Sequence, residues 1–112
     1  MTRINDKDVD KLLEFVDVDN AGGCVFHYLG KPFNGIIESF YDNGNRMDEV
    51  EYTDGHEGGV QREYFENGQV QHEHYVYFAK PEGDWKEWDE NGKLIHHSVW
   101  EKGIRKKTIV GK

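Results

Sequence analysis

Histidines are the side chains of this sequence best suited to bind a metal or to transfer a proton at neutral pH. His72 and His74 are two positions apart, and His96 follows His72 by 24 positions. Residues two apart on a strand point to the same face, so we expect His72 and His74 to be neighbours. His72 and His96 would lie two strands apart, about 9–10 Å, too far to share a metal at about 2 Å per bond. The sequence therefore predicts no metal site.

Carboxylates are numerous, with 22 Asp and Glu residues, but they form no recognisable catalytic pattern. The sequence contains no Ser-His-Asp arrangement, no phosphate-binding loop and no His-Glu-x-x-His motif. Gly58-Gly59 is too short to indicate a nucleotide site. We expect a protein that is not an enzyme and uses no cofactor.

The net charge of the 112-residue chain, −8, is unevenly distributed. Residues 102–112 contain five Lys or Arg residues and no acid, so residues 1–101 carry 22 acids against nine bases, a net charge of −13. Nucleic acids and anionic membranes repel so acidic a body, whereas a cationic protein attracts it. We expect residues 102–112 to form an edge strand that lysines protect from unwanted pairing.

Cys24 is the single cysteine, so an internal disulfide is excluded. We expect its side chain to be buried as a small hydrophobic group. No apolar run near the N-terminus resembles a signal peptide, and no stretch reaches membrane-spanning length. The sequence predicts a cytoplasmic protein.

A repeat of 24 residues organises the chain. Asn-Gly directly after an acid occurs at 43–44, 67–68 and 91–92, at an interval of 24 residues. An aromatic residue lies four positions before each of these glycines, and a second glycine lies nine positions before; these residues are Phe40, Tyr64 and Trp88, and Gly35, Gly59 and Gly83. The repeat predicts tandem β-hairpins, because Asn-Gly between strand-like runs is a strong hairpin signal.

Two turn geometries compete at each Asn-Gly. A two-residue turn places Tyr64 opposite Gln71, whereas a three-residue loop with glycine in a bulge places Tyr64 opposite Val70 and Trp88 opposite Leu94. We favour the bulged turn because it puts Tyr64 and Val70 on one face together with Val60 and Val76.

The predicted fold is all-β, a meandering antiparallel sheet of tandem 24-residue hairpin repeats within one domain, residues 1–112. Strands are expected at 36–41, 46–52, 60–65, 70–77, 85–89, 93–100 and 104–110, with loops at 53–58 and 79–83. Residues 28–51, 52–75 and 76–99 are the repeats, residues 100–112 are the last strand and basic tail, and residues 1–27 are a non-repeating cap. Residues 6–15 fit a short helix or an extended segment.

The repeats resemble a known family. Tyr28-Leu29-Gly30-Lys31-Pro32-Phe33-Asn34-Gly35 with Phe40-Tyr41-Asp42-Asn43-Gly44 resembles the start of bacterial MORN-variant repeat proteins, and residues 63–70 and 85–94 resemble later copies. The resemblance covers residues 27–104. It departs from the family pattern at Phe78-Ala79-Lys80-Pro81, where a turn with glycine is usual, and at Met47-Asp48, where Lys-Ser is common.

The chain is similar to the YwqK-type antitoxins within this family. The resemblance implies an immunity protein that binds a cognate toxin and blocks its active site, with a basic C-terminal toxin domain such as a nuclease or deaminase as partner. The alternative is a MORN-like scaffold for self-association or other protein contacts. We expect a monomer or weak homo-oligomer that binds neither nucleic acid nor membrane.

The bulged turn and strand alternation predict two faces. We expect Ile36, Phe40, Val50, Tyr52, Val60, Tyr64, Val70, Val76, Trp88, Leu94 and Trp100 on one face. The other face is expected to alternate aromatic residues and carboxylates, as protein-binding surfaces do. Its predicted partner-binding residues are Tyr41, Glu51, Glu63, Phe65, Glu73, Tyr75, Tyr77, Trp85 and Glu87. Alternatively, these aromatic residues are ordinary cross-strand pairs.

Overall fold

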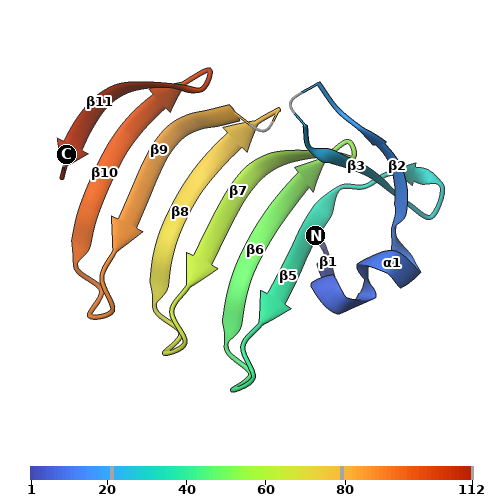
Figure 1. Ribbon diagram of the computed structural model, residues 1–112, viewed down its shortest axis with the longest axis horizontal. Coiled ribbons are helices and arrows are strands. Elements are labelled where there is room, and N and C mark those ends of the chain that lie inside the picture. The colour runs from blue at the N-terminus through green and yellow to red at the C-terminus, as the bar shows by residue number, and fades with distance from the viewer. Residues whose placement is uncertain (21, 79, 112) are drawn as a thin grey trace.

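The computed structural model describes residues 1–20, 22–78 and 80–111, and it shows one large sheet with a smaller sheet against it (Figure 1). The large sheet has eight strands in the order β1-β5-β6-β7-β8-β9-β10-β11. The strands from β5 onward form an antiparallel meander, which confirms the predicted all-β repeat fold. They are β5 (Gly35–Phe40), β6 (Arg46–Thr53), β7 (His56–Tyr64), β8 (Val70–Tyr77), β9 (Lys80–Trp88), β10 (Leu94–Glu101) and β11 (Ile104–Val110).

Each Asn-Gly turn is the bulged three-residue loop. In the second hairpin the Phe65 amide donates to the Gln69 carbonyl at 2.8 Å, and the Gly68 amide donates to the Phe65 carbonyl at 3.0 Å. Gly68 has a φ of +90°, the left-handed region that favours glycine. Tyr64 pairs with Val70 and Trp88 with Leu94, so the favoured turn geometry is confirmed.

The predicted composition of the two faces is wrong, because each hairpin contains an extra residue just after the turn. Glu63 pairs with His72 while Tyr64 pairs with Val70, so Gln71 has no partner in the ladder. Met47 and Ile95 occupy the same place in the neighbouring hairpins. Such a bulge inverts the alternation of side chains in the rest of the strand.

A second irregularity separates successive hairpins. Val50 pairs with Gln61 but Tyr52 pairs with Glu57, so residues 58–60 lie opposite Glu51 alone. Beyond it Val60 pairs with Tyr75, which places Val76 on the face opposite to Val60 and corrects that part of the prediction.

Two rows of directly paired residues define the faces. The ionic face carries, in register from β5 to β10, Glu38, Glu49, Arg62, Glu73, Lys86 and His97. The tryptophan face carries Ile37, Val50, Gln61, His74, Trp85 and Ser98. The predicted apolar face is therefore divided, with Ile36, Phe40, Val60, Tyr64, Val70, Trp88 and Leu94 on the ionic face and Val50, Tyr52, Val76 and Trp100 on the tryptophan face.

The loops at the end of the sheet opposite the Asn-Gly turns are shorter than predicted. Asp54-Gly55 forms a two-residue turn, and residues 56–58 of the predicted loop belong to β7. Residues 80–83 belong to β9. Position 79 of the other predicted loop, and position 112 of the basic tail, lie outside the described residues. β11 is an edge strand of the sheet, at the range predicted for it.

The N-terminal segment is neither wholly helical nor wholly extended. β1 (Thr2–Asn5) pairs with β5 in parallel, a 3-10 turn (Asp6–Asp8) and α1 (Val9–Leu12) follow, and β2 (Glu14–Val18), β3 (Cys24–Tyr28) and β4 (Lys31–Pro32) form the small sheet. Cys24 is exposed, so the expectation of a buried thiol is wrong. No helix in the described ranges has both the length and the apolar character needed to cross a membrane.

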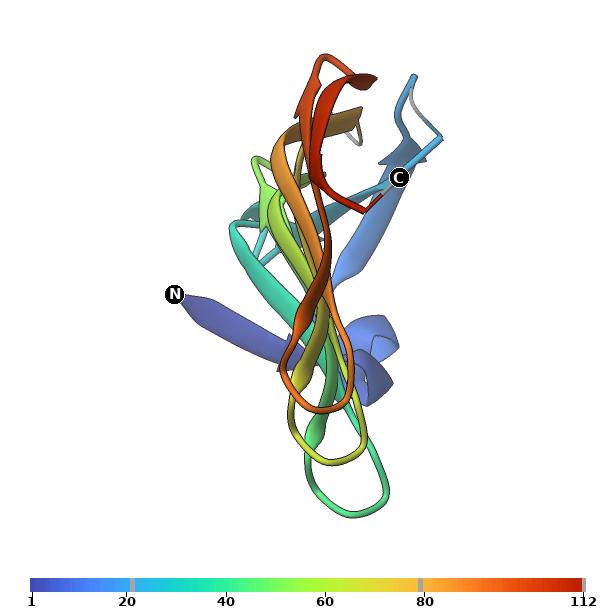
Figure 2. The ribbon, with the colours of Figure 1, turned by 90° about the vertical axis from the view of Figure 1, so that its left-hand side faces the viewer.

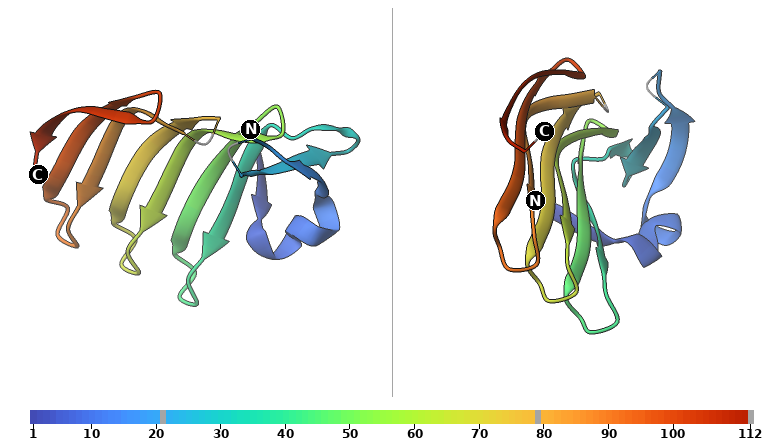
Figure 3. Two further views of the ribbon diagram at one scale, coloured as in Figure 1. Left: turned by 45° about the horizontal axis from the view of Figure 1, so that its top comes forward. Right: turned by 60° about the vertical axis from the view of Figure 1, so that its left-hand side comes forward.

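The main apolar core lies between the N-terminal segment and the first strands of the large sheet. Its buried members are Ile4, Leu13, Phe33 and Tyr52, and Phe26, Ile37 and Val50 pack against them. This core belongs to the tryptophan face, and Figures 2 and 3 show β2 and β3 on that single side of the large sheet. Over β8 to β11 the tryptophan face remains uncovered (Figure 1).

Candidate protein-binding surface

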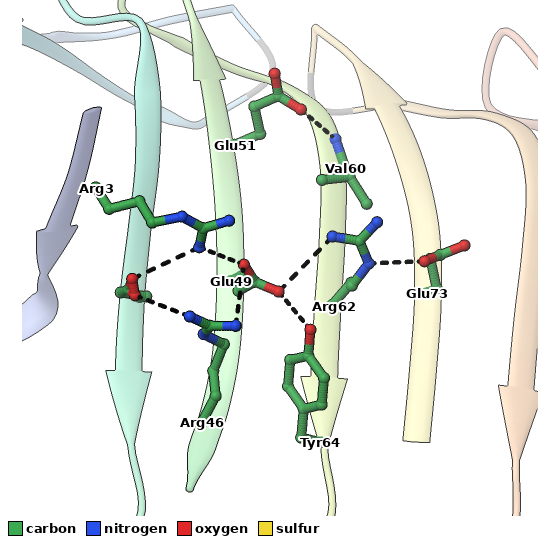
Figure 4. Close-up of polar contacts among 9 residues, drawn as sticks. Arg3, Arg46, Glu49, Glu51, Val60, Arg62, Tyr64 and Glu73 are labelled. Carbon is green, nitrogen blue, oxygen red and sulfur yellow. Dashed lines mark hydrogen bonds and ion pairs between the residues drawn. The ribbon is translucent and has the colours of Figure 1, made fainter. Parts of the chain in front are cut away.

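The carboxylates of the ionic face are paired with arginines. Glu49 is only 1% exposed, and it accepts hydrogen bonds from Arg3 Nη1 at 2.5 Å and from the Tyr64 hydroxyl (Figure 4). Arg46 and Arg62 approach the same carboxylate at 3.8 and 3.7 Å. Glu38 and Glu73 are likewise paired with arginine, so these three carboxylates are internally compensated.

This pairing determines the ionisation of Glu49. Burial by itself raises the pKa of the Glu49 carboxyl, but hydrogen bonds from Tyr64 and Arg3 and the charge of Arg46 outweigh it, so the pKa lies below its ordinary value. Glu49 is therefore a carboxylate at neutral pH, and its negative charge is balanced by arginines within the protein.

The uncovered part of the tryptophan face carries a cluster of rings. The His74 ring stacks on Trp85 with centroids 4.2 Å apart, and the Trp85 and Trp100 centroids are 5.5 Å apart. His72 meets the edge of Trp85 at 4.6 Å. Ser98, fully buried beneath, forms hydrogen bonds of 2.9 Å with Trp100 Nε1 and His96 Nε2. Three strands, β8, β9 and β10, thus hold these rings in fixed positions.

A carboxylate row borders these rings. The directly paired residues Asp48, Glu63, His72, Glu87 and His96 form the row from β6 to β10. Glu87 Oε1 lies 3.9 Å from His72 Nδ1, and exposed Glu63 has no side-chain partner among the described residues. In contrast to the ionic face, the acids here are not compensated by arginine.

A family model described as MORN repeat variant matches residues 33–54, 57–76 and 81–101, more than half of the chain. The chain belongs to the MORN repeat variant family. Each matched segment contains one hairpin, β5–β6, β7–β8 or β9–β10. No curated protein and no solved structure matches the chain.

A MORN repeat variant array is a scaffold for protein–protein contacts. The nine residues predicted to bind a partner lie in three different places. Pairing and alternation put Glu51, Glu73, Tyr75 and Tyr77 on the ionic face, and Glu63, Trp85 and Glu87 on the tryptophan face. Tyr41 and Phe65 lie at the hairpin turns and line one surface pocket with Glu66, Asn67 and Glu90. The expectation that all nine residues share one face is therefore wrong.

The MORN repeat hairpins also contribute residues that the sequence did not assign to a partner surface. His72, His74, Ser98 and Trp100 complete the ring cluster around Trp85. His72 and His74 are neighbours, as predicted, but the described residues include no group of three His, Cys, Asp or Glu side chains arranged to hold a metal. A cluster of two histidines and two tryptophans across three strands, β8, β9 and β10, is the signal that would have indicated this surface.

The histidine pair is sensitive to pH. His72 Nε2 and His74 Nδ1 are 2.6 Å apart, a hydrogen bond in which one nitrogen donates and the other accepts. Burial first, and then the neighbouring His72, lower the pKa of His74 from 6.5 to about 4. His74 is therefore neutral in the folded protein at neutral pH.

We expect His74 to make the protein less stable in mild acid. Because the pKa of His74 is depressed on folding, its contribution is complete above pH 6.5 and falls as pH decreases from 6.5 towards 4, by about 1–2 kcal/mol after allowance for partial exposure. Urea unfolding of the wild type and His74→Phe at pH 7.5 and 5.0 measures this term. The variant retains a ring to stack on Trp85, and an equal loss in both proteins would contradict the prediction.

Proposed function

We propose that this MORN repeat variant protein is an antitoxin, or immunity protein, that binds a cognate basic toxin domain through the uncovered part of its tryptophan face. The observation that carries the proposal is the difference between the faces. Glu38, Glu49 and Glu73 of the ionic face are neutralised by arginines, whereas the row containing Glu63 and Glu87 borders the Trp85 cluster without such partners.

The ring cluster supports tight binding. Tryptophan is enriched among residues that dominate binding energy, particularly where surrounding contacts exclude water. Trp85 and Trp100 are half-buried, and Ser98 fixes Trp100 by a hydrogen bond, so little side-chain entropy remains to be lost on binding.

The charge supports a basic partner. Toxin domains that act on nucleic acids, such as nucleases or deaminases, bind phosphates with Lys and Arg. A row of carboxylates complements such a site, steers the two proteins together and occludes the entrance. The protein acts stoichiometrically in the cytoplasm, without a cofactor, as a monomer or weak homo-oligomer, and nucleic acid and membrane are not its partners.

Charge reversal on the tryptophan face tests the proposal. We expect Glu63→Lys/Glu87→Lys to weaken binding at least 100-fold to the cognate toxin domain, which is to be sought in the adjacent reading frame, and to abolish protection of cells that express the toxin. Isothermal titration calorimetry measures the affinity, and Tyr75→Ala on the ionic face is the matched control.

Two outcomes would contradict different parts of the proposal. Wild-type affinity in the double variant, with reduced affinity in Tyr75→Ala, would transfer the interface to the ionic face. Failure of the wild-type protein to bind or neutralise the neighbouring toxin would exclude the antitoxin function itself.

A scaffold that associates with itself is the second candidate. Edge strand β11 exposes Ile104 and Ile109, at 61% and 54%, and an edge strand can pair with another chain. The exposed Arg105, Lys106 and Lys107 on the same strand oppose close pairing of two copies, and this favours the antitoxin.

A further inference from the structure

A pocket lies where the β6–β7 and β8–β9 turns adjoin. Its volume is about 380 Å³, and its lining includes the rings of His56, Tyr77 and Phe78 and the acids Asp54 and Glu57. Tyr77 and Phe78 meet edge to face with centroids 4.6 Å apart, and His56 lies 5.8 Å from Phe78. Two carboxylates thus share a pocket with three rings.

Phe78 is unusual in its backbone conformation. It has a φ of +49° and takes the left-handed turn position that Leu29, Asp54 and Lys102 occupy in the other strand-to-strand turns. A bulky side chain is disfavoured in this region, and the Phe78 ring is also 52% exposed. Leu29 combines a φ of +54° with 83% exposure in its own turn, so what distinguishes Phe78 is that its aromatic ring lines the pocket.

Hydrogen bonds within the protein hold residues of the pocket in place. His56 Nδ1 lies 2.9 Å from Asp19 Oδ2, which ties the ring to the β2–β3 connection. The Thr53 hydroxyl donates to the Gly58 carbonyl at 3.0 Å, and the Asp54 amide donates to Asn34 Oδ1 at 2.9 Å. The β6–β7 turn and the start of β7, which carry the two acids, are therefore fixed by hydrogen bonds.

We propose that this pocket, at the end of the sheet where the two faces meet, binds an arginine side chain of the partner protein, an inference that rests on the proposed function. A guanidinium stacks on aromatic rings and donates paired hydrogen bonds to carboxylates, which matches Tyr77, Phe78, Asp54 and Glu57. Arginine fits better than lysine because its planar guanidinium group can stack on a ring and donate paired hydrogen bonds to a carboxylate at the same time.

The charged residues on the two sides of Phe78 determine from which side a guanidinium group enters the pocket. On the side away from Asp54, the Phe78 ring lines a second pocket of about 570 Å³ with Lys80, Glu82 and Lys102. Two lysines there repel a guanidinium. The cation therefore enters from the side of Asp54 and Glu57.

An NMR titration of the full chain with N-acetyl-arginine methylamide tests the pocket without the toxin. We expect saturable shifts of the Gly58, Tyr77 and Phe78 amides at millimolar ligand, and at least fivefold weaker binding of the neutral citrulline analogue. Phe78→Asn, which suits the left-handed position but removes the ring, should weaken arginine binding at least fivefold. Leu29→Asn, the same change in a distant turn, should bind arginine as the wild type does.

Several results would overturn the inference. Equal shifts with the citrulline analogue would show that charge is not recognised, and unchanged binding in Phe78→Asn would exclude the ring. Glu57→Gln keeps every ring, so it tests the pocket even where Phe78→Asn fails to fold, and unchanged arginine binding there would also overturn the inference. Because the toxin is absent from this titration, its result is independent of the proposed antitoxin function.

Discussion

Replacing Glu49 by glutamine is expected to lower the free energy of unfolding by about 3–5 kcal/mol, the usual cost of removing one member of a buried ion pair. The Glu49 carboxylate joins Arg3 of β1, Arg46 of its own strand, and Arg62 and Tyr64 of β7. Glutamine has nearly the same shape, but it leaves three guanidinium groups with insufficient negative charge. The loss arises from electrostatics and not from a cavity.

Urea unfolding at pH 7 followed by circular dichroism measures this effect. Glu73→Gln is the matched control, because Glu73 has 22% side-chain exposure and pairs with Arg62 alone. We expect the control to lose about 1 kcal/mol or less. Equal losses in the two variants would show that the network does not depend on Glu49.

Alanine at position 59 is expected to destabilise the fold by about 3 kcal/mol or more, through strain and a lost hydrogen bond. Gly59 has a φ of +112°, and a Cβ atom there would clash with Glu51 Oε1. The same oxygen accepts a hydrogen bond of 3.0 Å from the Val60 amide, as Figure 4 shows. The substituted chain must therefore displace the Glu51 carboxylate as well as adopt an unfavourable conformation.

Gly83, one repeat later, separates these two causes. Its φ is +83°, but nothing lies within 4 Å of an added Cβ atom. Gly83→Ala should therefore lose only the conformational part, about 1–2 kcal/mol. The free energies of unfolding of Gly59→Ala and Glu51→Ala/Gly59→Ala, measured in the same urea assay, isolate the clash with the Glu51 carboxylate. If the double variant is no more stable than Gly59→Ala, the clash does not contribute to the loss of stability.

Local chemistry explains the correct parts of the sequence prediction. The Asn-Gly dipeptides, each after an acid, specify a three-residue loop with glycine in the left-handed region, and this determines which residues face each other beside the turn. The predicted strands 70–77 and 104–110 coincide with β8 and β11, since Asn67-Gly68 precedes β8 and Gly103 and Gly111 flank β11.

The faces were not predictable from alternation alone. Gln71 and the residues opposite Glu51 are extra residues in one strand of a pair, so they are recognised only once the partner strand is known. Each such irregularity changes which side chains share a face of the sheet. Trp85 was therefore placed beside Tyr75, although the structure puts it beside His74 and Trp100 on the other side.

The sequence by itself determined the hairpin repeat, its turns and the acidic character of the surface, because these depend on residues close together in the chain. Tertiary structure alone decided which acids are available to a partner. Arg3 reaches Glu49 across 46 positions and neutralises one face, and the N-terminal segment covers the first strands of the other. Such long-range contacts arise from how strands pair and segments pack, and no local pattern encodes them.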